Sequence, residues 1–257
     1  MESRYRESFT GSIRAEAYDE LYAPDSYASL LWEIEKEFLA RFVSNLRVNH
    51  QRINYMDYAC GTGRVLSFIE PSVDSATGID VSQDMLDRAR SRTGNASLLK
   101  GDASEDSAVL GNQKYDLITL FRFLLNTEPK TRSRVVGVLA GRLKDNTSRF
   151  VFNNHGNPFS HKMVMLPSHM LRSLGHPRGT LGNYLTHRDI LACISGTGLE
   201  IESVYGYGYI SNKMLRLLGP VRTLWLERFL AGAPVIQVVG VNQIYVAKLR
   251  INSRSTI

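Results

Sequence analysis

Cysteine is scarce in this sequence, and long apolar runs are missing. The 257 residues contain two cysteines, Cys60 and Cys193, which cannot form a framework of disulfides, so we expect a reducing compartment. No stretch reaches the roughly 18 uninterrupted apolar residues that suggest a membrane-spanning helix. The first seven residues are mostly charged and lack the apolar segment of a secretion signal. These absences predict a cytoplasmic protein, or one that is peripheral to a membrane.

Basic charge is unevenly distributed along the chain. The formal net charge is +6, yet the residues from 152 onwards contain eleven basic and four acidic side chains, a net charge of +7. The excess permits an anionic partner without requiring one. The six histidines lack metal-ligand spacing, so we expect no metal. No run of Lys and Arg with interleaved aromatic residues predicts a nucleic-acid groove, so no nucleic-acid partner is expected.

Short apolar runs alternate with amphipathic segments through the first three fifths of the chain. The runs typical of strands are residues 53–58, 75–79, 97–100, 115–120 and 149–152. Helical periodicity marks residues 27–46, 64–69, 83–91 and 131–143. This alternation predicts an α/β fold with right-handed crossovers, in which helices cover both faces of a doubly wound, mainly parallel sheet.

The alternation stops after residue 153. Residues 154–186 have no clear period, and they are followed by a helix at 190–195, a strand at 200–207, an apolar and basic segment at 211–231 and a β-rich stretch at 239–249. We therefore expect four parts. They are an N-terminal helical lid (1–50), a cofactor-binding α/β core (51–153), an acceptor-side insertion (154–186) and a C-terminal completion of the sheet (187–257) that contains a helical insertion (209–231).

Four polar or glycine-rich features fall at the carboxyl ends of four successive predicted strands. They are the turn 57–63 (Asp-Tyr-Ala-Cys-Gly-Thr-Gly), Asp80, the tripeptide 101–103 (Gly-Asp-Ala) and the segment 120–123 (Leu-Phe-Arg-Phe). Ligands bind at this edge of open α/β sheets. Glycines allow close approach to the backbone and to a helix N-terminus, and a carboxylate at the second strand tip can accept hydrogen bonds from ribose hydroxyls. The pattern indicates a nucleoside ligand.

Two phosphate-binding motifs fit poorly. The third glycine of a dinucleotide fingerprint is replaced by Leu66, and Gly63 is followed by Arg64 instead of the lysine of a phosphate loop. The acid at Asp57, before the turn, suits an ammonium group better than a pyrophosphate. A nucleotide-sugar or NAD-dependent enzyme remains an alternative at this point.

The four features in this order resemble the class I S-adenosylmethionine-dependent methyltransferases. The resemblance rests on residues 57–63, 78–86 (Gly-Ile-Asp-Val-Ser-Gln-Asp-Met-Leu), 101–103 and 115–118 (Tyr-Asp-Leu-Ile), and on an aromatic N-terminal segment at 18–22. It covers roughly residues 15–153 and a last strand at 243–249. One departure is Ala59, which stands where the family has its first turn glycine. The resemblance implies a seven-stranded sheet whose last strand is antiparallel.

The resemblance also implies the cofactor, S-adenosylmethionine, and the residues that would bind it. Asp57 would orient the methionine ammonium, Asp80 would hold the ribose hydroxyls, and Asp102 would accept from the adenine amino group. Val81 and Met85 would pack on adenine. The full set of implied cofactor contacts is Tyr18, Tyr22, Asp57, Ala59, Cys60, Gly61, Gly63, Asp80, Val81, Met85, Asp102, Ala103 (through its backbone N–H) and Phe121 (near the sulfonium).

The acceptor side is less well defined by the sequence. Arg122 and Phe123 would face the acceptor, Tyr207 could stack on it, and His187 either contributes there or only starts a helix. His155, just after the fifth strand, could remove a proton from a hydroxyl, or be an ordinary loop histidine.

Several cofactor residues also have purely structural readings. Asp80 could be only a helix cap, Asp102 a turn residue and Met85 a core residue. Tyr18 and Tyr22 could simply pack on the first helix.

The expected function is O-methylation of a small-molecule or glycan hydroxyl, with an anionic or lipid-linked acceptor and peripheral membrane contact as further options. Methyl transfer depends mainly on in-line positioning, so a general base is optional. The Asn/Asp-Pro-Pro-Tyr signature implied by resemblance to amino-methylating nucleic-acid enzymes is absent. The alternatives are N- or C-methylation of a small metabolite and a non-catalytic S-adenosylmethionine-binding regulator.

Overall fold

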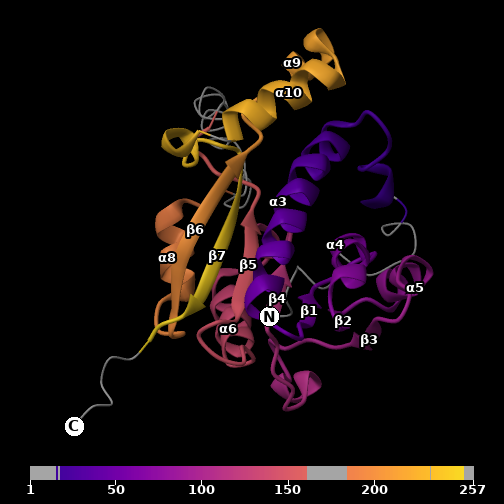
Figure 1. Cartoon of the computed structure of the whole chain (residues 1–257), viewed down its shortest axis with the longest axis vertical. Helices are drawn as coiled ribbons and strands as arrows, with labels where there is room; N and C mark the ends of the chain where they lie inside the picture. Colours follow the sequence, from indigo (N-terminus) through magenta and orange to yellow (C-terminus); the bar gives the residue numbers. More distant parts are fainter. Residues whose placement is uncertain (1–15, 17, 161–183, 232, 252–257) are drawn as a thin grey trace, which may run out of the picture.

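A seven-stranded sheet organises the chain (Figure 1). The computed structural model describes residues 16, 18–160, 184–231 and 233–251. In spatial order the strands are β3 (Ser97–Lys100), β2 (Ser75–Asp80), β1 (Asn54–Tyr58), β4 (Leu117–Leu120), β5 (Arg149–Asn154), β7 (Asn242–Leu249) and β6 (Leu199–Tyr207). Strands β1 to β5 pair in parallel, and β7 is antiparallel to both neighbours. The predicted mainly parallel sheet with an antiparallel last strand is confirmed.

The central strands are apolar because both faces of the sheet are covered. All four residues of β4 are buried, as are the last four of β1 and the last five of β5. Such strands give nearly continuous apolar runs instead of an alternating pattern. For this reason the strands are recognisable in the sequence as apolar runs and not by an alternation of apolar and polar residues.

Helices pack on both faces of the sheet. One face carries α3 (Tyr27–Asn49), α4 (Arg64–Ile69) and α5 (Gln83–Arg92), and the other carries α6 (Pro129–Ala140) and α8 (His187–Ile194). Ser82 caps α5 by accepting from the Met85 N–H, and Thr186 and Asp189 form a capping box on α8. The helix predicted at 131–143 instead begins at Pro129 and ends at Ala140, and Leu143 forms a parallel bridge with Tyr115.

The remaining elements lie in the connections. Short 3-10 turns are η1 (Glu70–Ser72), η2 (Ser107–Leu110), η3 (Leu124–Asn126) and η5 (Pro234–Ile236). The segment after β6 forms two helices, α9 (Asn212–Leu218) and α10 (Pro220–Ala231), which extend beyond the sheet in Figure 1. Of the expected lid, residues 1–15 and 17 lie outside the described part, as do residues 161–183 of the expected acceptor-side insertion.

The strand register brings the predicted motifs to one edge. Tyr58 pairs with Ile79, Asp80 with Lys100, and Leu120 with Phe152. The carboxyl ends of β1 to β5 therefore share this edge. β6 runs parallel to β5, since each is antiparallel to β7, so β6 also ends there.

Candidate functional site

The turn after β1 leaves open space above its backbone. An added Cβ on Gly61 (φ +55°) would meet no atom within 4 Å, whereas one on Gly63 (φ +80°) would lie 3.0 Å from the Cα of Ala89 in α5. Gly63 is therefore required for the close approach of α5, and Gly61 leaves room for a ligand. Ala59 also has a positive φ of +55°, a conformation that residues with a Cβ seldom adopt.

Asp57 is a buried acid with one unpartnered oxygen. Its Oδ1 accepts a hydrogen bond of 2.6 Å from Thr119 Oγ1. Thr119 Oγ1 in turn accepts a hydrogen bond of 2.7 Å from the Tyr55 hydroxyl. No described group donates to its buried Oδ2. Burial raises the pKa of Asp57 to about 7, with the Thr119 hydrogen bond acting in the opposite direction. A cationic donor such as an ammonium group would satisfy this carboxylate.

Asp80 lies at the end of β2, where backbone amides orient it. Its Oδ2 accepts from the Gly61 N–H at 2.8 Å and its Oδ1 from the Ser82 N–H at 2.9 Å. Burial raises the pKa of Asp80, and these backbone hydrogen bonds oppose the shift. A carboxylate has about four lone-pair sites, so both oxygens can still accept from a ribose diol.

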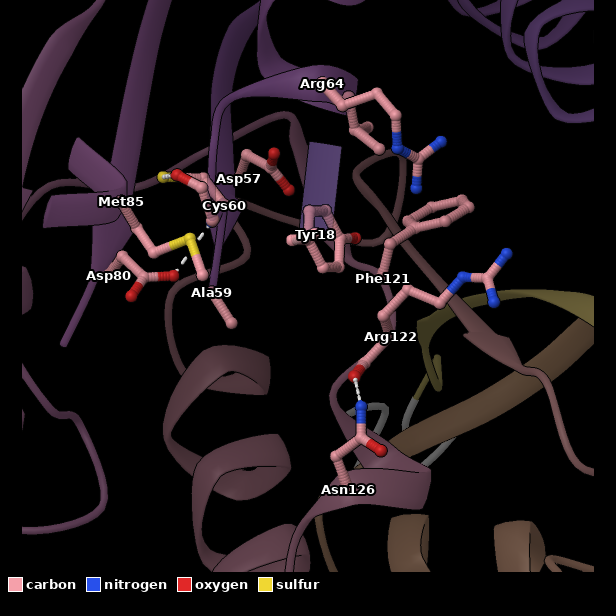
Figure 2. Close-up of a pocket in the computed structure, with 12 residues that line it drawn as sticks. Tyr18, Asp57, Ala59, Cys60, Arg64, Asp80, Met85, Phe121, Arg122 and Asn126 are labelled. Carbon is pink, nitrogen blue, oxygen red and sulfur yellow. Dashed lines mark hydrogen bonds between the residues drawn. The ribbon is translucent and has the colours of Figure 1, made fainter. Parts of the chain in front are cut away.

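Two cavities meet at Ala59 and Asp80, which line both of them. The first has a volume of about 630 Å³ and the second about 330 Å³. The first is lined by Tyr18, Asp57, Ala59, Cys60, Gly61, Arg64, Val65, Asp80, Met85, Phe121, Arg122 and Asn126 (Figure 2). The second is lined by Tyr58, Ala59, Asp80, Val81, Gly101, Asp102, Ser104, Phe123 and Thr131. Together they span the four motifs.

The second cavity has the character of a base-binding end. It combines the aromatic rings of Tyr58 and Phe123, which pack edge to face with centroids 5.9 Å apart, with the carboxylate of Asp102. Val81 also lines it. Met85 instead lines the first cavity. The backbone N–H of Ala103 donates to the Tyr58 hydroxyl at 2.9 Å, which disagrees with the expectation that it would donate to adenine.

Arg122 holds an unusual backbone conformation at the opposite end. Its φ is +58°, and two hydrogen bonds hold the turn: its N–H donates to Asn153 Oδ1 at 2.7 Å, and its carbonyl accepts from Asn126 Nδ2 at 2.6 Å. A non-glycine residue in this region is strained unless its surroundings enforce it. Figure 2 shows Arg122, Phe121 and Asn126 toward one end of the first cavity, and Asp80 and Met85 toward the other.

A buried ionic cluster lies behind this end of the cavity, and the sequence did not predict it. Glu35 of α3 is fully buried and accepts from Arg64 at 3.0 Å and from Arg122 at 3.3 Å. The Tyr207 hydroxyl also donates to Glu35. Burial would raise the pKa of Glu35, but the two arginines and Tyr207 hold it below its usual value. With two guanidinium groups and one carboxylate, the cluster carries a net positive charge.

A signal for Glu35 was present in the sequence. Leu31 and Leu39 lie four residues before and after it, and both are buried. An acid between apolar residues at i−4 and i+4 is on the buried stripe of a helix. Its partners, however, come from positions too far apart in sequence to be identified.

The aromatic N-terminal segment is fastened over the glycine turn. Tyr18 lines the first cavity, and Tyr22 contacts both its ring (centroids 5.6 Å apart) and the Arg64 guanidinium (4.2 Å). Between them, Asp19 accepts from the Thr62 hydroxyl at 2.9 Å and pairs with Arg92 at 2.7 Å. Asp19 is a positioning residue that the sequence did not single out.

Four residues expected to contact the acceptor or perform catalysis lie elsewhere. Phe123 faces the second cavity, away from Arg122's end, and Tyr207 is fully buried against Glu35. His187 stacks on Tyr245 of β7 and lies 3.1 Å from its hydroxyl. His155 follows β5 but lines neither cavity. Full burial disagrees with stacking of Tyr207 on an acceptor, and the expected roles of Phe123, His187 and His155 stay predictions.

Neither a reactive thiolate nor a metal-binding cluster is found among the described residues. Cys60 is buried, burial raises the pKa of its thiol, and among the described residues its Sγ has a hydrogen bond only to the Gly61 carbonyl, at 3.9 Å. It is a structural residue of the turn and not a thiolate. No group of three His, Cys, Asp or Glu side chains in the described part of the chain is arranged to hold a metal ion.

Comparisons with known proteins agree with this geometry. A family model described as a methyltransferase domain matches residues 56–146. No curated protein matches the sequence. Among solved structures, magnesium protoporphyrin IX methyltransferase from Synechocystis with bound SAH is similar, with a TM-score of 0.63 at 15% identity, covering 95% of this chain and 98% of that one.

Two further solved structures have the same fold. A putative methyltransferase in complex with the Trm112 activator, from Haloferax volcanii, gives a TM-score of 0.61 at 15% identity, with 97% and 99% of the two chains covered. An S-adenosylmethionine-dependent methyltransferase from Clostridium acetobutylicum gives 0.59 at 18% identity, with 92% and 98% covered. At these identities the likeness concerns the fold.

The domain match extends over the glycine turn, Asp80 and Asp102, and the fold is shared with those structures. The site fits the cofactor, since Asp57 lacks a donor on one oxygen and Gly61 faces open space. Residues 56–146 form a methyltransferase domain, and the chain has the fold of class I S-adenosylmethionine-dependent methyltransferases.

Proposed function

We propose that this methyltransferase acts on an oxygen of a small-molecule or glycan acceptor that carries an anionic group. The observation that carries the proposal is the net positive charge of the Arg64, Glu35 and Arg122 cluster, of which the two arginines line the first cavity. The buried Nε atoms of Arg64 and Arg122 have no hydrogen-bond partner among the described residues. Buried guanidinium donors favour a carboxylate or phosphate over a neutral group.

The two cavities would divide the work between cofactor and acceptor. Asp57 would bind the ammonium group of the cofactor, Asp80 its ribose hydroxyls, and Asp102 its adenine amino group. When bound, the cofactor supplies a methyl group on a positively charged sulfur. Gly61 would let the cofactor approach the backbone of the turn. Contacts with this backbone would then add to those of the three carboxylates.

Arg122 would then orient the acceptor. In-line alignment alone can supply about 7–11 kcal/mol of the barrier reduction in favourable cases. The acceptor oxygen takes the methyl carbon, the electron pair of the broken carbon–sulfur bond stays on sulfur, and the hydroxyl proton passes to water. Asp57 and Asp80, the two carboxylates that line the first cavity, are both assigned to the cofactor in this scheme.

A screen of acceptor pools tests the proposal. Each pool contains hydroxyl compounds as carboxylates or phosphates and, separately, as their neutral esters, and mass spectrometry detects the gain of one CH2 unit. We expect gains only in the anionic pools. Turnover of neutral compounds alone, or transfer to nitrogen or carbon, would contradict the proposal, and no transfer to any pool would favour a non-catalytic binding protein.

Arg122 is tested separately from the cofactor. Arg122→Lys keeps the charge but loses the fork of donors, so the KM for the acceptor should rise while the affinity for S-adenosylhomocysteine stays unchanged. Arg90→Lys, on the exposed side of α5, is the matched control. A loss of S-adenosylhomocysteine affinity with an unchanged acceptor KM would assign Arg122 to the methionine carboxylate instead.

A further inference from the structure

Helix α10 exposes an apolar stripe and buries two polar side chains, while its Leu224 packs against the core. Val221, Trp225 and Phe229, spaced by four residues, are 81%, 64% and 68% exposed. The face opposite carries Thr223, Glu227 and Ala231, all buried. A surface helix normally turns its apolar stripe inward. This helix turns it outward, and the rings of Trp225 and Phe229 stack on each other with centroids 6.0 Å apart.

Hydrogen bonds to the chain after β6 fix this orientation. Glu227 accepts from the Gly208 N–H at 2.9 Å and from the Ile210 N–H at 2.6 Å. The buried Thr223 hydroxyl is satisfied locally, because it donates to the carbonyl of Gly219, four residues earlier, at 2.8 Å. Because Glu227 satisfies two otherwise buried backbone donors, rotating the helix to hide Trp225 would leave those donors and a buried acid unpaired. The hydrogen bonds of Glu227 therefore keep the apolar face of α10 exposed.

Helix α9 extends the apolar surface and adds positive charge. Leu217 is 76% exposed and Met214 is 41% exposed. The charged side chains of the two helices are basic apart from Glu227, which is buried. The exposed ones are Lys213, Arg216, Arg222 and Arg228. Only Arg228 among them has an acidic partner in the described part of the chain, Glu37 at 2.8 Å.

We propose that the surface formed by Met214, Leu217, Val221, Trp225 and Phe229, with its surrounding cations, binds an anionic lipid bilayer. Aromatic and aliphatic side chains insert into the interface between headgroups and acyl chains, and nearby lysines and arginines are attracted to anionic headgroups. A second copy of the chain fits less well, because like surfaces would bring the unpaired cations together. No helix in the described residues has the length and apolar character needed to cross a bilayer, so the contact is interfacial.

This surface lies close to the sheet edge that carries the candidate site. Helix α9 follows the carboxyl end of β6, where Tyr207 pairs with Asn242 of β7, next to the end of β5. This is the sheet edge that carries the cofactor motifs, and Tyr27 ties α3 to the connection by donating to the Ile210 carbonyl at 2.7 Å. Bilayer contact would thus hold the acceptor side of the site near the membrane surface. The bilayer contact itself does not depend on the proposed acceptor.

Sedimentation of the full chain with vesicles of phosphatidylcholine, with and without phosphatidylglycerol, tests the inference. We expect binding only to the vesicles with phosphatidylglycerol, weakening as salt rises because the attraction is screened. The Trp225→Ser/Phe229→Ser variant should bind at least about tenfold more weakly. The control Val48→Ser removes another apolar side chain, 83% exposed near the end of α3, and should bind like the wild type.

Three results would overturn the inference. They are no binding to either vesicle, equal binding by the Trp225→Ser/Phe229→Ser variant, and a dimer of the wild type in light scattering that this variant dissociates. S-adenosylhomocysteine affinity, measured on the same variants without lipid, should stay at the wild-type value. A failure of the bilayer contact is thereby distinguished from a failure of the cofactor site.

Discussion

Asp57 is a buried carboxylate whose charge is costly until a ligand offsets it. Its pKa is raised to about 7, above the ordinary 3.8, so the folded protein binds this proton more tightly than the unfolded chain does. The stability of the ligand-free protein is therefore unaffected well below the ordinary value and falls as the pH rises from there through about 7. A bound ammonium group reverses the preference by favouring the carboxylate.

Asp57→Asn separates the two effects. At pH 8 the ligand-free variant should melt at a higher temperature than the wild type, because the buried charge is gone. Its affinity for S-adenosylhomocysteine should fall by about 10–100-fold, which corresponds to the roughly 1.5–3 kcal/mol of a hydrogen bond to a charged group. Wild-type affinity should rise with pH through about 7 in calorimetric titrations. An affinity that is flat with pH in the wild type would contradict this role.

Glu35 is the residue whose loss should damage the fold most through charge. Glu35→Gln leaves the half-buried Arg64 and Arg122 without a carboxylate, and breaking such a cluster typically costs about 3–5 kcal/mol. Urea unfolding at neutral pH measures it, with Glu33→Gln on the same helix as control. Glu33 is 43% exposed in its pair with Lys36, so about 1 kcal/mol or less is expected.

The Glu35 contribution has a definite pH dependence. Its folded-state pKa is lowered, so the stabilisation is present above the ordinary value and is lost as the pH falls through the lowered one. The difference between Glu35→Gln and the wild type should therefore shrink in acid. A difference of less than about 1 kcal/mol at neutral pH would show that the cluster is not essential.

At the scale of elements, the turn from β1 to α4 allows a matched comparison of two glycines. Gly61→Ala introduces a strained φ, which costs about 1–2 kcal/mol, but its Cβ meets no protein atom. Gly63→Ala has similar strain and also places Cβ 3.0 Å from the Ala89 backbone. We expect Gly63→Ala to lower the melting temperature more. We expect Gly61→Ala to weaken S-adenosylhomocysteine binding by at least about tenfold, or about 1.4 kcal/mol. The reverse order in either measurement would show that the open space above Gly61 is not the ligand site.

Elements with local causes were predictable, and those with distant causes were not. The Thr186–Asp189 capping box and the apolar runs of β1, β4 and β5 follow from neighbouring residues. The Glu35 cluster joins residues up to 172 positions apart, so no local pattern contains it. The sequence also did not reveal that Phe123, one residue after Arg122, faces a different cavity. The positive φ of Arg122 redirects the chain between them.

At the scale of the whole molecule, the order of the motifs predicted the sheet edge, but the sequence order of the last strands did not reveal that β7 lies between β5 and β6. The positive charge of the protein is found in two places. Some of it surrounds the apolar surface of α9 and α10, while the positive charge beside the cavity comes from Arg64 and Arg122 in the nearly neutral first part.

Ligand binding should stabilise the molecule as one unit, because the two cavities are lined by residues of β1, β2, α4 and α5 and of the segments after β3 and β4. At a concentration 100 times its Kd, S-adenosylhomocysteine should add about 2.7 kcal/mol. For a chain of this size that is a rise in melting temperature of about 5–10 °C. Thermal unfolding followed by circular dichroism measures it, and NAD at the same concentration should have no effect. A rise with NAD alone would contradict the assigned cofactor.

We expect Asp80, at the carboxyl edge of the sheet, to hold the cofactor, and calorimetric titration with S-adenosylhomocysteine measures its contribution. The wild type and Asp87→Asn, a change on the exposed side of α5, should bind with the same affinity. Asp80→Asn should bind at least about tenfold more weakly, because it replaces one acceptor of the ribose hydroxyls with a donor. Equal affinity of Asp80→Asn and the wild type would show that Asp80 does not hold the cofactor. No binding by the wild type would show that this edge of the sheet is not the cofactor site.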